Sequence, residues 1–286
     1  MTYHARIRLP FAAAQRKRKI HFPFDLRLGS LAIPAHPVFE FLAYAIGFLC
    51  FRVLRRRFGD PVSDASRWTV ITAGVAGAAI GSRVLYWFED PAATLARWRD
   101  PVYLLGGKTI VGALIGGLLF VELAKRLAGE TRSTGDLFAA PIALGIAIGR
   151  IGCFLAGLPD GTYGVATSLP WGVDFGDGVR RHPTQLYESL FALALFFVLL
   201  HLLQRPHRNG DVFKAFMLAY LGWRLAVDFL KPEIRLGIFS GIQWACAAMF
   251  LYYAADIRRW LGRKTPHASL EIETLQAAPS RDARKA

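Results

Sequence analysis

The sequence is poor in cysteine, and its few cysteines are not arranged as disulfide partners or metal ligands. Cys50, Cys153 and Cys246 are odd in number, each lies within an apolar run, and none belongs to a CxxC or CxxH spacing. We therefore expect neither a disulfide framework nor a zinc site. Cys153 has no obvious base beside it along the chain, so we interpret it as a small apolar filler in a buried helix.

Acidic residues are scarce relative to basic ones. The 286 residues include 21 Asp and Glu against 35 Lys and Arg, which gives a formal net charge of +14. In a soluble protein this charge would suggest a nucleic-acid partner. Only 20% of the residues are charged and 53% are hydrophobic, however, and such a composition indicates lipid as the solvent. We expect membrane lipids to surround the chain and no nucleic acid to bind it.

The apolar residues are grouped into segments of about twenty, which is the length that crosses a bilayer as a helix. These segments lie at about 37–53, 68–88, 103–124, 137–157, 185–203, 212–230 and 242–260. They predict an all-α integral membrane protein with about seven transmembrane helices and a transmembrane domain at 36–261. A basic segment at 1–35 has no apolar stretch typical of a cleaved signal peptide. The polar tail at 262–286 is expected to be disordered.

The distribution of basic residues in alternate loops predicts the orientation, because cytoplasmic loops collect Lys and Arg. Fourteen lie after the first, third, fifth and seventh segments, and six lie in the opposite loops. The fourteen are Arg52, Arg55, Arg56, Arg57, Arg67, Lys125, Arg126, Arg132, Arg205, Arg208, Arg258, Arg259, Arg263 and Lys264; the six are Arg97, Arg99, Arg180, Arg181, Lys231 and Arg235. The prediction is an external N-terminus and a cytoplasmic C-terminus, although a basic cluster at 16–19 opposes it.

Several charged residues lie inside the predicted spans, where an unpaired charge costs at least a few kcal/mol. They are Glu40, Arg83, Lys108, Arg150, Glu188, Arg224 and Asp228. Arg150 is interpreted either as an anion site, because a guanidinium matches phosphate oxygens, or as the partner of a buried acid. Arg224 and Asp228 are four residues apart, so an ion pair within one helix would explain both charges without a ligand.

The start of the fifth span carries further polar residues. Thr184 is a candidate N-cap, and His182, Gln185 and Glu188 recur every three residues, which places them on one helix face. The long loop at about 158–183 precedes them, and loops of this length are often functional. His36 and Glu40 are likewise four residues apart at the start of the first span. Each group is interpreted either as the lining of a polar cavity or as a satisfied structural pair.

Four segments together resemble the prolipoprotein diacylglyceryl transferase family. They are GRIG at 149–152, LPWGV at 169–173, RHPTQLYE at 181–188 and RLAVD at 224–228. Their order and spacing match the family over about residues 28–261. The resemblance implies a bacterial inner-membrane enzyme with seven helices and a polar, lipid-accessible central cavity. Such an enzyme moves the sn-1,2-diacylglyceryl group of phosphatidylglycerol onto the lipobox cysteine of a prolipoprotein in lipoprotein maturation. No metal or cofactor is implied.

The resemblance also implies roles for individual residues. The arginine of GRIG contacts the phospholipid in that family, and a second essential arginine matches Arg224. We expect catalysis to involve Arg150, Arg224 and His182. The expected substrate-binding residues are Arg150, Arg224, Asp136, Gly152, Gly164, Gln185, Glu188 and Asp228.

This chain departs from the family where a catalytic base would be expected. The family usually has His-Gly-Gly-Leu in its third helix, but this chain has Val111 at the histidine position. The family's tyrosine in the first helix is Glu40 here, and the asparagine after GRIG is Cys153. If a base is required, His182, Glu40 or His36 could supply it.

Two other functions remain open at this point. A homologue of the same fold could transfer a lipid-derived group to another acceptor, which the missing histidine favours. The second alternative is a membrane protein that binds or transports phospholipid without catalysing a reaction. Transporters often show internal repeats or paired broken helices, and we see neither in this sequence.

Overall fold

The computed structural model describes residues 21–262, and within them the chain is mainly helical. The predictions for residues 1–20 and 263–286, including the tail and the basic cluster at 16–19, lie outside the described residues. The longer helices are α1 (Ala35–Phe58), α2 (Asp64–Trp87), α5 (Ile110–Leu127), α6 (Asp136–Ala156), α7 (Thr184–Leu203), α8 (Asp211–Val227) and α9 (Gly241–Tyr252). The shorter ones are α3 (Pro91–Ala96), α4 (Pro101–Gly106), α10 (Ala254–Leu261) and the 3-10 turns η1 (Leu158–Asp160) and η2 (Asp228–Leu230).

Three small antiparallel hairpins complete the described chain. Strands β1 (Asp25–Leu28) and β2 (Leu31–Pro34) lead into α1. Strands β3 (Val173–Asp174) and β4 (Arg180–Arg181) lie in the long loop before α7, and β5 (Arg235–Leu236) and β6 (Phe239–Ser240) join α8 to α9. The first hairpin lies at the end of the basic segment at 1–35.

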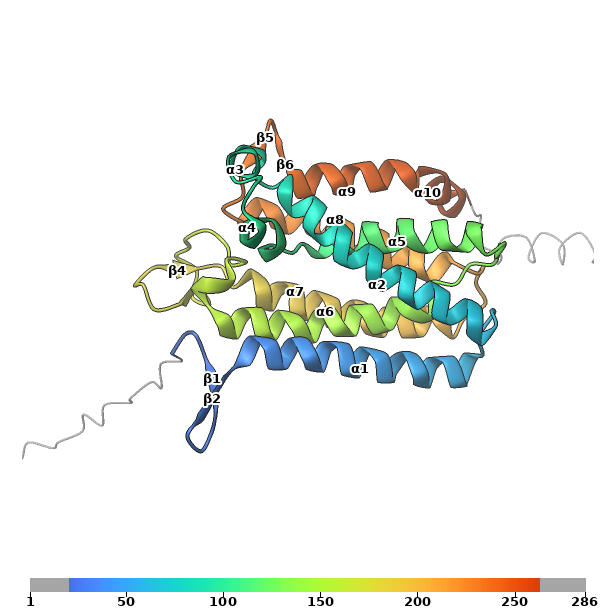
Figure 1. Ribbon diagram of the computed structural model, residues 1–286, viewed down its shortest axis with the longest axis horizontal. Helices are drawn as coiled ribbons and strands as arrows, with labels where there is room; N and C mark the ends of the chain where they lie inside the picture. The colour runs from blue at the N-terminus through green and yellow to red at the C-terminus, as the bar shows by residue number, and fades with distance from the viewer. Residues whose placement is uncertain (1–20, 263–286) are drawn as a thin grey trace, which may run out of the picture.

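The helices run back and forth through one bundle. α6 packs along α1 and α7, and α2 packs along α5. Figure 1 shows the β1–β2 hairpin, α3, α4, β4 and the β5–β6 hairpin at one end of the bundle, on the left, while α1 meets α2 at the other end. Alternate connections therefore lie at opposite ends, as the sequence predicted.

Local sequence signals explain where several helices begin. The hydroxyls of Ser63 and Thr109 accept hydrogen bonds from backbone N–H groups in the first turns of α2 and α5. Ser240 and Gln243 form a reciprocal capping box at α9. Thr184 does not cap α7 as predicted. It is the first helical residue, and its hydroxyl instead donates to the Thr162 carbonyl at 2.6 Å.

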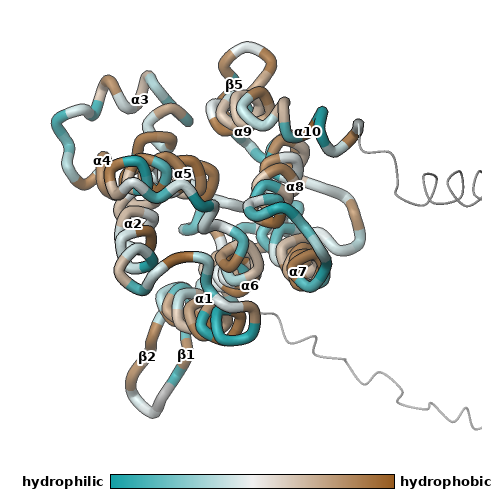
Figure 2. Tube along the Cα trace, turned by 90° about the vertical axis from the view of Figure 1, so that its right-hand side faces the viewer, coloured by the Kyte–Doolittle hydropathy of each residue, from teal (hydrophilic) through white to brown (hydrophobic). Residues whose placement is uncertain are grey.

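The bundle exposes apolar side chains on its outer faces, as expected of helices that contact lipid. Phe41 on α1, Val75 on α2, Leu190 on α7 and Leu251 on α9 are all largely exposed. Figure 2 shows hydrophobic residues along the helices around the periphery of the bundle. Within residues 21–262, α1, α2, α6 and α7 are long and apolar enough to cross a membrane by length and composition.

Two predicted spans differ from the observed helices. The third was expected from about 103, but Pro101–Gly106 forms the separate helix α4 and α5 begins only at Ile110. Lys108 therefore lies in the break between them rather than inside a span. The seventh is divided at Tyr253 into α9 and α10.

Candidate active site

A cluster of charged side chains is buried between α6, α7 and α8. Glu188 of α7 lies between two arginines: its Oε2 is 3.0 Å from Arg150 Nε on α6 and 3.4 Å from Arg224 Nη1 on α8. The Tyr220 hydroxyl donates a hydrogen bond to the other carboxylate oxygen of Glu188. All four residues are at most 7% exposed. The structure thus brings together Arg150, Glu188 and Arg224, three of the residues expected to bind the substrate.

The cluster continues beyond α8 through Asp228 and Lys231. Arg224 Nη2 is 2.7 Å from Asp228 Oδ1, so the predicted ion pair within one helical segment is confirmed. Lys231 Nζ lies 3.9 Å from the same oxygen. Arg224 therefore contacts two carboxylates at once. Its ion pair with Asp228 leaves other guanidinium N–H groups available for Glu188 or a ligand.

Several polar atoms in this region are buried without a hydrogen bond. They include Nε of Arg150, Nε of Arg224 and both amide atoms of Gln185. The Arg150–Glu188 contact is close in distance but is not aligned as a hydrogen bond, so it is an ion pair that leaves donor capacity unused. Buried polar atoms normally find a partner. The two amide atoms of Gln185, which have no partner among the described residues, are available to a polar ligand.

The formal charge of the cluster supports the same conclusion. Its three cations, Arg150, Arg224 and Lys231, exceed by one the two carboxylates that form ion pairs with them, Glu188 and Asp228. Ionised groups away from water are costly unless paired. One further negative charge, such as that of a phosphodiester, would balance the cluster. Guanidinium groups are well suited to hold it, since their planar N–H donors match phosphate oxygens.

Lys231 and the neighbouring acids titrate closer to neutral pH than usual. Burial, together with the charges of Arg224 and Arg150, lowers the pKa of Lys231 to about 8. Burial and the charge of Glu233 raise the pKa of Glu89, in the turn after α2, to about 7. The pKa of Glu233 is itself raised by burial and by Asp228.

Gly164 holds the long loop against the cluster. Its N–H donates to the His182 carbonyl at 2.9 Å, and Val165 N–H donates to the Leu230 carbonyl at 2.8 Å. A Cβ at Gly164 would lie only 2.7 Å from His182 Cβ and 2.8 Å from the Leu230 oxygen. Only glycine fits there, so the residue's structural role is to join the loop to the start of α7 and the end of η2.

His182 belongs to the loop and not to the charged cluster. Its Nδ1 is 3.2 Å from the Tyr187 hydroxyl, which also accepts a hydrogen bond from Trp171 Nε1 at 2.8 Å. Among residues 21–262, His182 makes no ion pair or side-chain hydrogen bond with Arg150 or Glu188. Its predicted catalytic role therefore stays a prediction.

Asp136 lies at the first turn of α6, whereas Arg150 is fourteen residues along the same helix, or roughly 21 Å away. Its carboxylate accepts hydrogen bonds from the N–H groups of Gly210 at 2.5 Å and Phe213 at 2.9 Å, at the start of α8. This contact satisfies the positive end of a helix. Substrate binding by Asp136 also stays a prediction.

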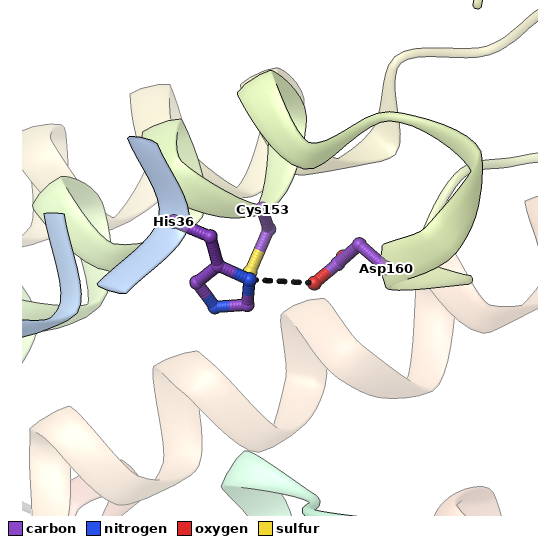
Figure 3. A group of neighbouring side chains, drawn as sticks. All are labelled: His36, Cys153 and Asp160. Carbon is purple, nitrogen blue, oxygen red and sulfur yellow. Dashed lines mark ion pairs between the residues drawn. The ribbon is translucent and has the colours of Figure 1, made fainter. Parts of the chain in front are cut away.

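His36 and Glu40 do not pair with each other. Glu40 contacts Lys108 Nζ at 2.8 Å, whereas His36 Nδ1 is 3.6 Å from Asp160 Oδ1 of η1. His36 and Asp160 lie beside Cys153 of α6, and Figure 3 shows the three side chains converging. Arg150 Nη1 is 3.9 Å from the Cys153 sulfur. This second cluster therefore adjoins the first.

The interpretation of Cys153 as a buried apolar filler is wrong. The residue is only partly buried and has polar neighbours. The sequence held no signal for this, because His36 lies more than a hundred residues away. Gly152 explains the close approach of α1 and α6: a Cβ there would be 2.8 Å from Phe39 Cβ and 3.2 Å from the His36 carbonyl oxygen.

Tyr220 was also not predicted from the sequence as a residue of the charged cluster, although its position four residues before Arg224 places it on the same helix face.

Comparisons with known proteins identify the family of the chain. A model of the family described as prolipoprotein diacylglyceryl transferase matches residues 23–257. The chain is 34% identical to the phosphatidylglycerol–prolipoprotein diacylglyceryl transferase of Bordetella avium over 242 residues, covering 80% of this chain and 90% of the relative. It is 34% identical to that of Cupriavidus necator over 278 residues, covering 87% and 97%. The Vibrio vulnificus relative is 32% identical over 216 residues, covering 70% and 77%. Because the family model covers most of the chain and these relatives match it over most of their length, this chain belongs to the prolipoprotein diacylglyceryl transferase family.

Proposed function

We propose that this protein transfers the sn-1,2-diacylglyceryl group of phosphatidylglycerol to the lipobox cysteine thiol of a prolipoprotein. The observation that carries the proposal is the buried cluster in which Arg150 and Arg224 both contact Glu188 and one positive charge is left unbalanced. The named relatives carry this activity, and the chain matches them over most of its length.

The cluster suits the charge changes of this reaction. The thiol sulfur attacks the glyceryl carbon, the bond between that carbon and the phosphate oxygen breaks, and glycerol phosphate leaves with the electron pair. Negative charge grows on the leaving phosphate in the transition state. Fixed guanidinium groups in a site with little water stabilise such charge strongly. Arg150 and Arg224 are the groups that we assign to this role.

The remaining binding residues would shape the site around the head group. Gln185 has two free amide atoms that suit the hydroxyls of the terminal glycerol. Glu188 and Asp228 hold the arginines in place, while Gly152 and Gly164 let helix and loop backbones approach. Asp136 would act only through the helix that carries Arg150, since its carboxylate caps α8. His182 lies in the outer loop, where it would meet the protein substrate.

We infer a setting in the bacterial inner membrane, with seven spans around a polar, lipid-accessible cavity. Four helices in the described part of the chain are long and apolar enough to cross a membrane by themselves. α5, α8 and α9 run beside them in the same bundle and would supply the other three (Figure 1). The basic loops at the end of the bundle opposite the cluster favour a cytoplasmic position for that end. The cluster and the long loop would then face the side where exported prolipoproteins arrive.

One departure favours a second candidate function. Val111 replaces the family's histidine and is 1% exposed, so the third long helix supplies no base. A same-fold transferase acting on a different acceptor would need no such histidine. A lipobox peptide and an acceptor without cysteine, each supplied with labelled phosphatidylglycerol, would distinguish the two.

Complementation tests the proposed function in cells. A strain depleted of its own transferase should grow when it expresses the unmodified chain, and Arg150→Ala and Arg224→Ala should each abolish rescue. Arg83→Ala is the matched control, because the only side-chain hydrogen bond of Arg83 within residues 21–262 goes to the Ala79 carbonyl of its own helix. Failure of the unmodified chain to rescue, while a relative's gene succeeds, would count against the proposal.

A further inference from the structure

Three different ligand types meet at the end of the bundle that carries the long loop. His36 is the second residue of α1, Cys153 lies in the last turn of α6, and Asp160 ends η1. One nitrogen, one sulfur and one oxygen atom from these side chains lie within 4.8 Å of one another (Figure 3). Nitrogen, thiolate and carboxylate ligands together suit Zn²⁺.

The spacing fits a shared metal ion better than a direct contact. His36 Nδ1 and Asp160 Oδ1 are 3.6 Å apart, which is too long for a hydrogen bond. Two ligands of a tetrahedral zinc ion, each about 2.0–2.2 Å from the metal, are roughly 3.4 Å apart. The histidine and the carboxylate are therefore already at nearly the separation that such an ion requires.

Surrounding groups hold the three ligands in place. Thr162 donates its hydroxyl proton to Asp160 Oδ2, which leaves Oδ1 directed at the cluster. The close approach of α1 to Gly152 fixes the backbone of His36. Arg150 Nη1, 3.9 Å from the sulfur, stabilises negative charge on it. Partners of this kind orient metal ligands and tune the ion.

The cluster leaves room for a fourth ligand. The His36 side chain is 35% exposed, whereas that of Asp160 is 7% exposed. A fourth ligand would therefore approach the cluster from the side of His36. Three protein ligands and one open position are typical of catalytic rather than structural zinc. The Cys153 sulfur is about 2.3 Å from a bound zinc ion. The ion would then lie at most about 6 Å from Arg150 Nη1.

We propose that His36, Cys153 and Asp160 bind one Zn²⁺ ion whose fourth position takes the acceptor cysteine thiol of the prolipoprotein. This inference rests on the proposed function and names the group that activates its nucleophile. It replaces the expectation of no metal drawn from the sequence. It also accounts for the missing histidine at Val111, because a metal-bound thiol needs no separate base to hold it as thiolate.

The step balances without any further reactant. The acceptor thiol displaces water from the ion and loses its proton to solvent. Its sulfur then forms a bond to the glyceryl carbon, and the bond between that carbon and the phosphate oxygen breaks. The electron pair leaves with glycerol phosphate beside Arg150. A thioether is a weak zinc ligand, so the product dissociates and the fourth position opens again.

Metal binding can be measured without the reaction. The full chain in detergent, stripped with a chelator and titrated with Co²⁺, should bind one ion and show a sulfur-to-cobalt charge-transfer absorption. Cys153→Ser should lose that absorption, while His36→Ala and Asp160→Asn should weaken binding by at least tenfold. Cys50→Ser, which changes another α1 residue, should keep both signals. Absence of a sulfur-to-cobalt band in the unmodified chain would overturn the inference.

Activity separates this inference from the proposed function. The stripped enzyme should form thioether from phosphatidylglycerol and a lipobox peptide about 100-fold more slowly than the zinc-loaded enzyme, the size of effect expected on losing a base. Added Zn²⁺ should restore the rate in the unmodified chain but not in Cys153→Ser. Full activity of the stripped enzyme would overturn the metal site and leave the transferase intact. No product from any form, with a relative's enzyme active, would instead reject the proposed function.

Discussion

At the scale of single residues, the most informative contact is that of Glu188 with two arginines. A carboxylate in this position holds Arg150 and Arg224 close together despite their repulsion, and Tyr220 fixes its second oxygen. The arginines are thus set in place before any lipid binds. Such preorganisation spares the cost of rearrangement during the reaction.

Lys231 gives the site a pH dependence. Its pKa is lowered from 10.5 to about 8, so the ammonium loses its proton as the pH rises from 7 to 9. The two carboxylates then balance the two arginines, and the cluster loses its spare positive charge. We expect the KM for phosphatidylglycerol to rise about tenfold over this range, since a bond to a charged group is worth about 1.5–3 kcal/mol.

The matched variant for this prediction is Lys231→Arg, which keeps its charge over the same range. Its KM should rise less than that of the unmodified chain between pH 7 and 9, because the remaining change comes from Glu89, whose pKa is about 7. Steady-state kinetics with phosphatidylglycerol dispersed in detergent would provide the measurement. An equal rise in KM for both proteins would show that another group is responsible.

At the scale of helices, the packing of α2 on α5 depends on glycines. A Cβ at Gly116 would lie 2.2 Å from the Gly77 carbonyl oxygen, and one at Gly81 would lie 2.3 Å from the Gly112 carbonyl oxygen. Small residues allow helix backbones in membranes to approach this closely. Gly112, next to Val111, therefore retains a packing role although the histidine before it is absent.

We predict that Gly116→Ala lowers the free energy of unfolding by about 1–3 kcal/mol, because the added methyl group forces the helices apart. Gly117→Ala is the control, since a Cβ there meets its nearest neighbour at an ordinary 3.4 Å. Thermal unfolding of both variants in detergent should show a lower midpoint only for Gly116→Ala. Equal midpoints would contradict the packing.

Patterns within short stretches of sequence predicted most of the long helices. They did not predict contacts between residues far apart in the sequence. The pairing of Arg224 with Asp228 was predictable because four residues make one helical turn. The contact of Arg150 with Glu188 joins two helices, so spacing along the chain could not reveal it. Only the resemblance to a family placed Arg150 and Arg224 in one site.

The errors have physical causes. The third span was placed too early because α4 is apolar, yet Pro101 and Asp100 start a separate short helix there. Thr184 follows Pro183 and so stands inside α7, where its hydroxyl reaches the loop instead of capping. Cys153 and His36 meet because Gly152 lets α1 and α6 approach, which apolar periodicity does not encode.

At the scale of the whole molecule, the ion pairs around Arg67 and the charged cluster around Arg150 lie toward opposite ends of the bundle. Arg67 contacts Asp60 and the Thr134 carbonyl at the end of the bundle where α1 meets α2. Such contacts stabilise that end. The cluster around Arg150 lies toward the opposite end, near the long loop. An enzyme that joins a membrane lipid to an exported protein needs its site near one end of the bundle, where the protein can reach it.

The predicted orientation can be tested with single cysteines. Asp177→Cys in the long loop should react with a membrane-impermeant maleimide in intact cells. Arg208→Cys, between α7 and α8, should react only after the membrane is permeabilised. The unmodified chain, with its own three cysteines, provides the background. The reverse pattern would place the cluster on the cytoplasmic side.

The central claim is that Arg150 and Arg224 hold the phosphate of phosphatidylglycerol while its diacylglyceryl group moves to a cysteine. Mass spectrometry of a lipobox peptide incubated with the purified chain and phosphatidylglycerol tests it most directly. We predict a peptide heavier by one diacylglyceryl group in thioether linkage, release of glycerol phosphate, and loss of both products in Arg150→Lys, whose ammonium cannot replace the planar fork. An unmodified peptide, under conditions in which a relative's enzyme is active, would contradict the account.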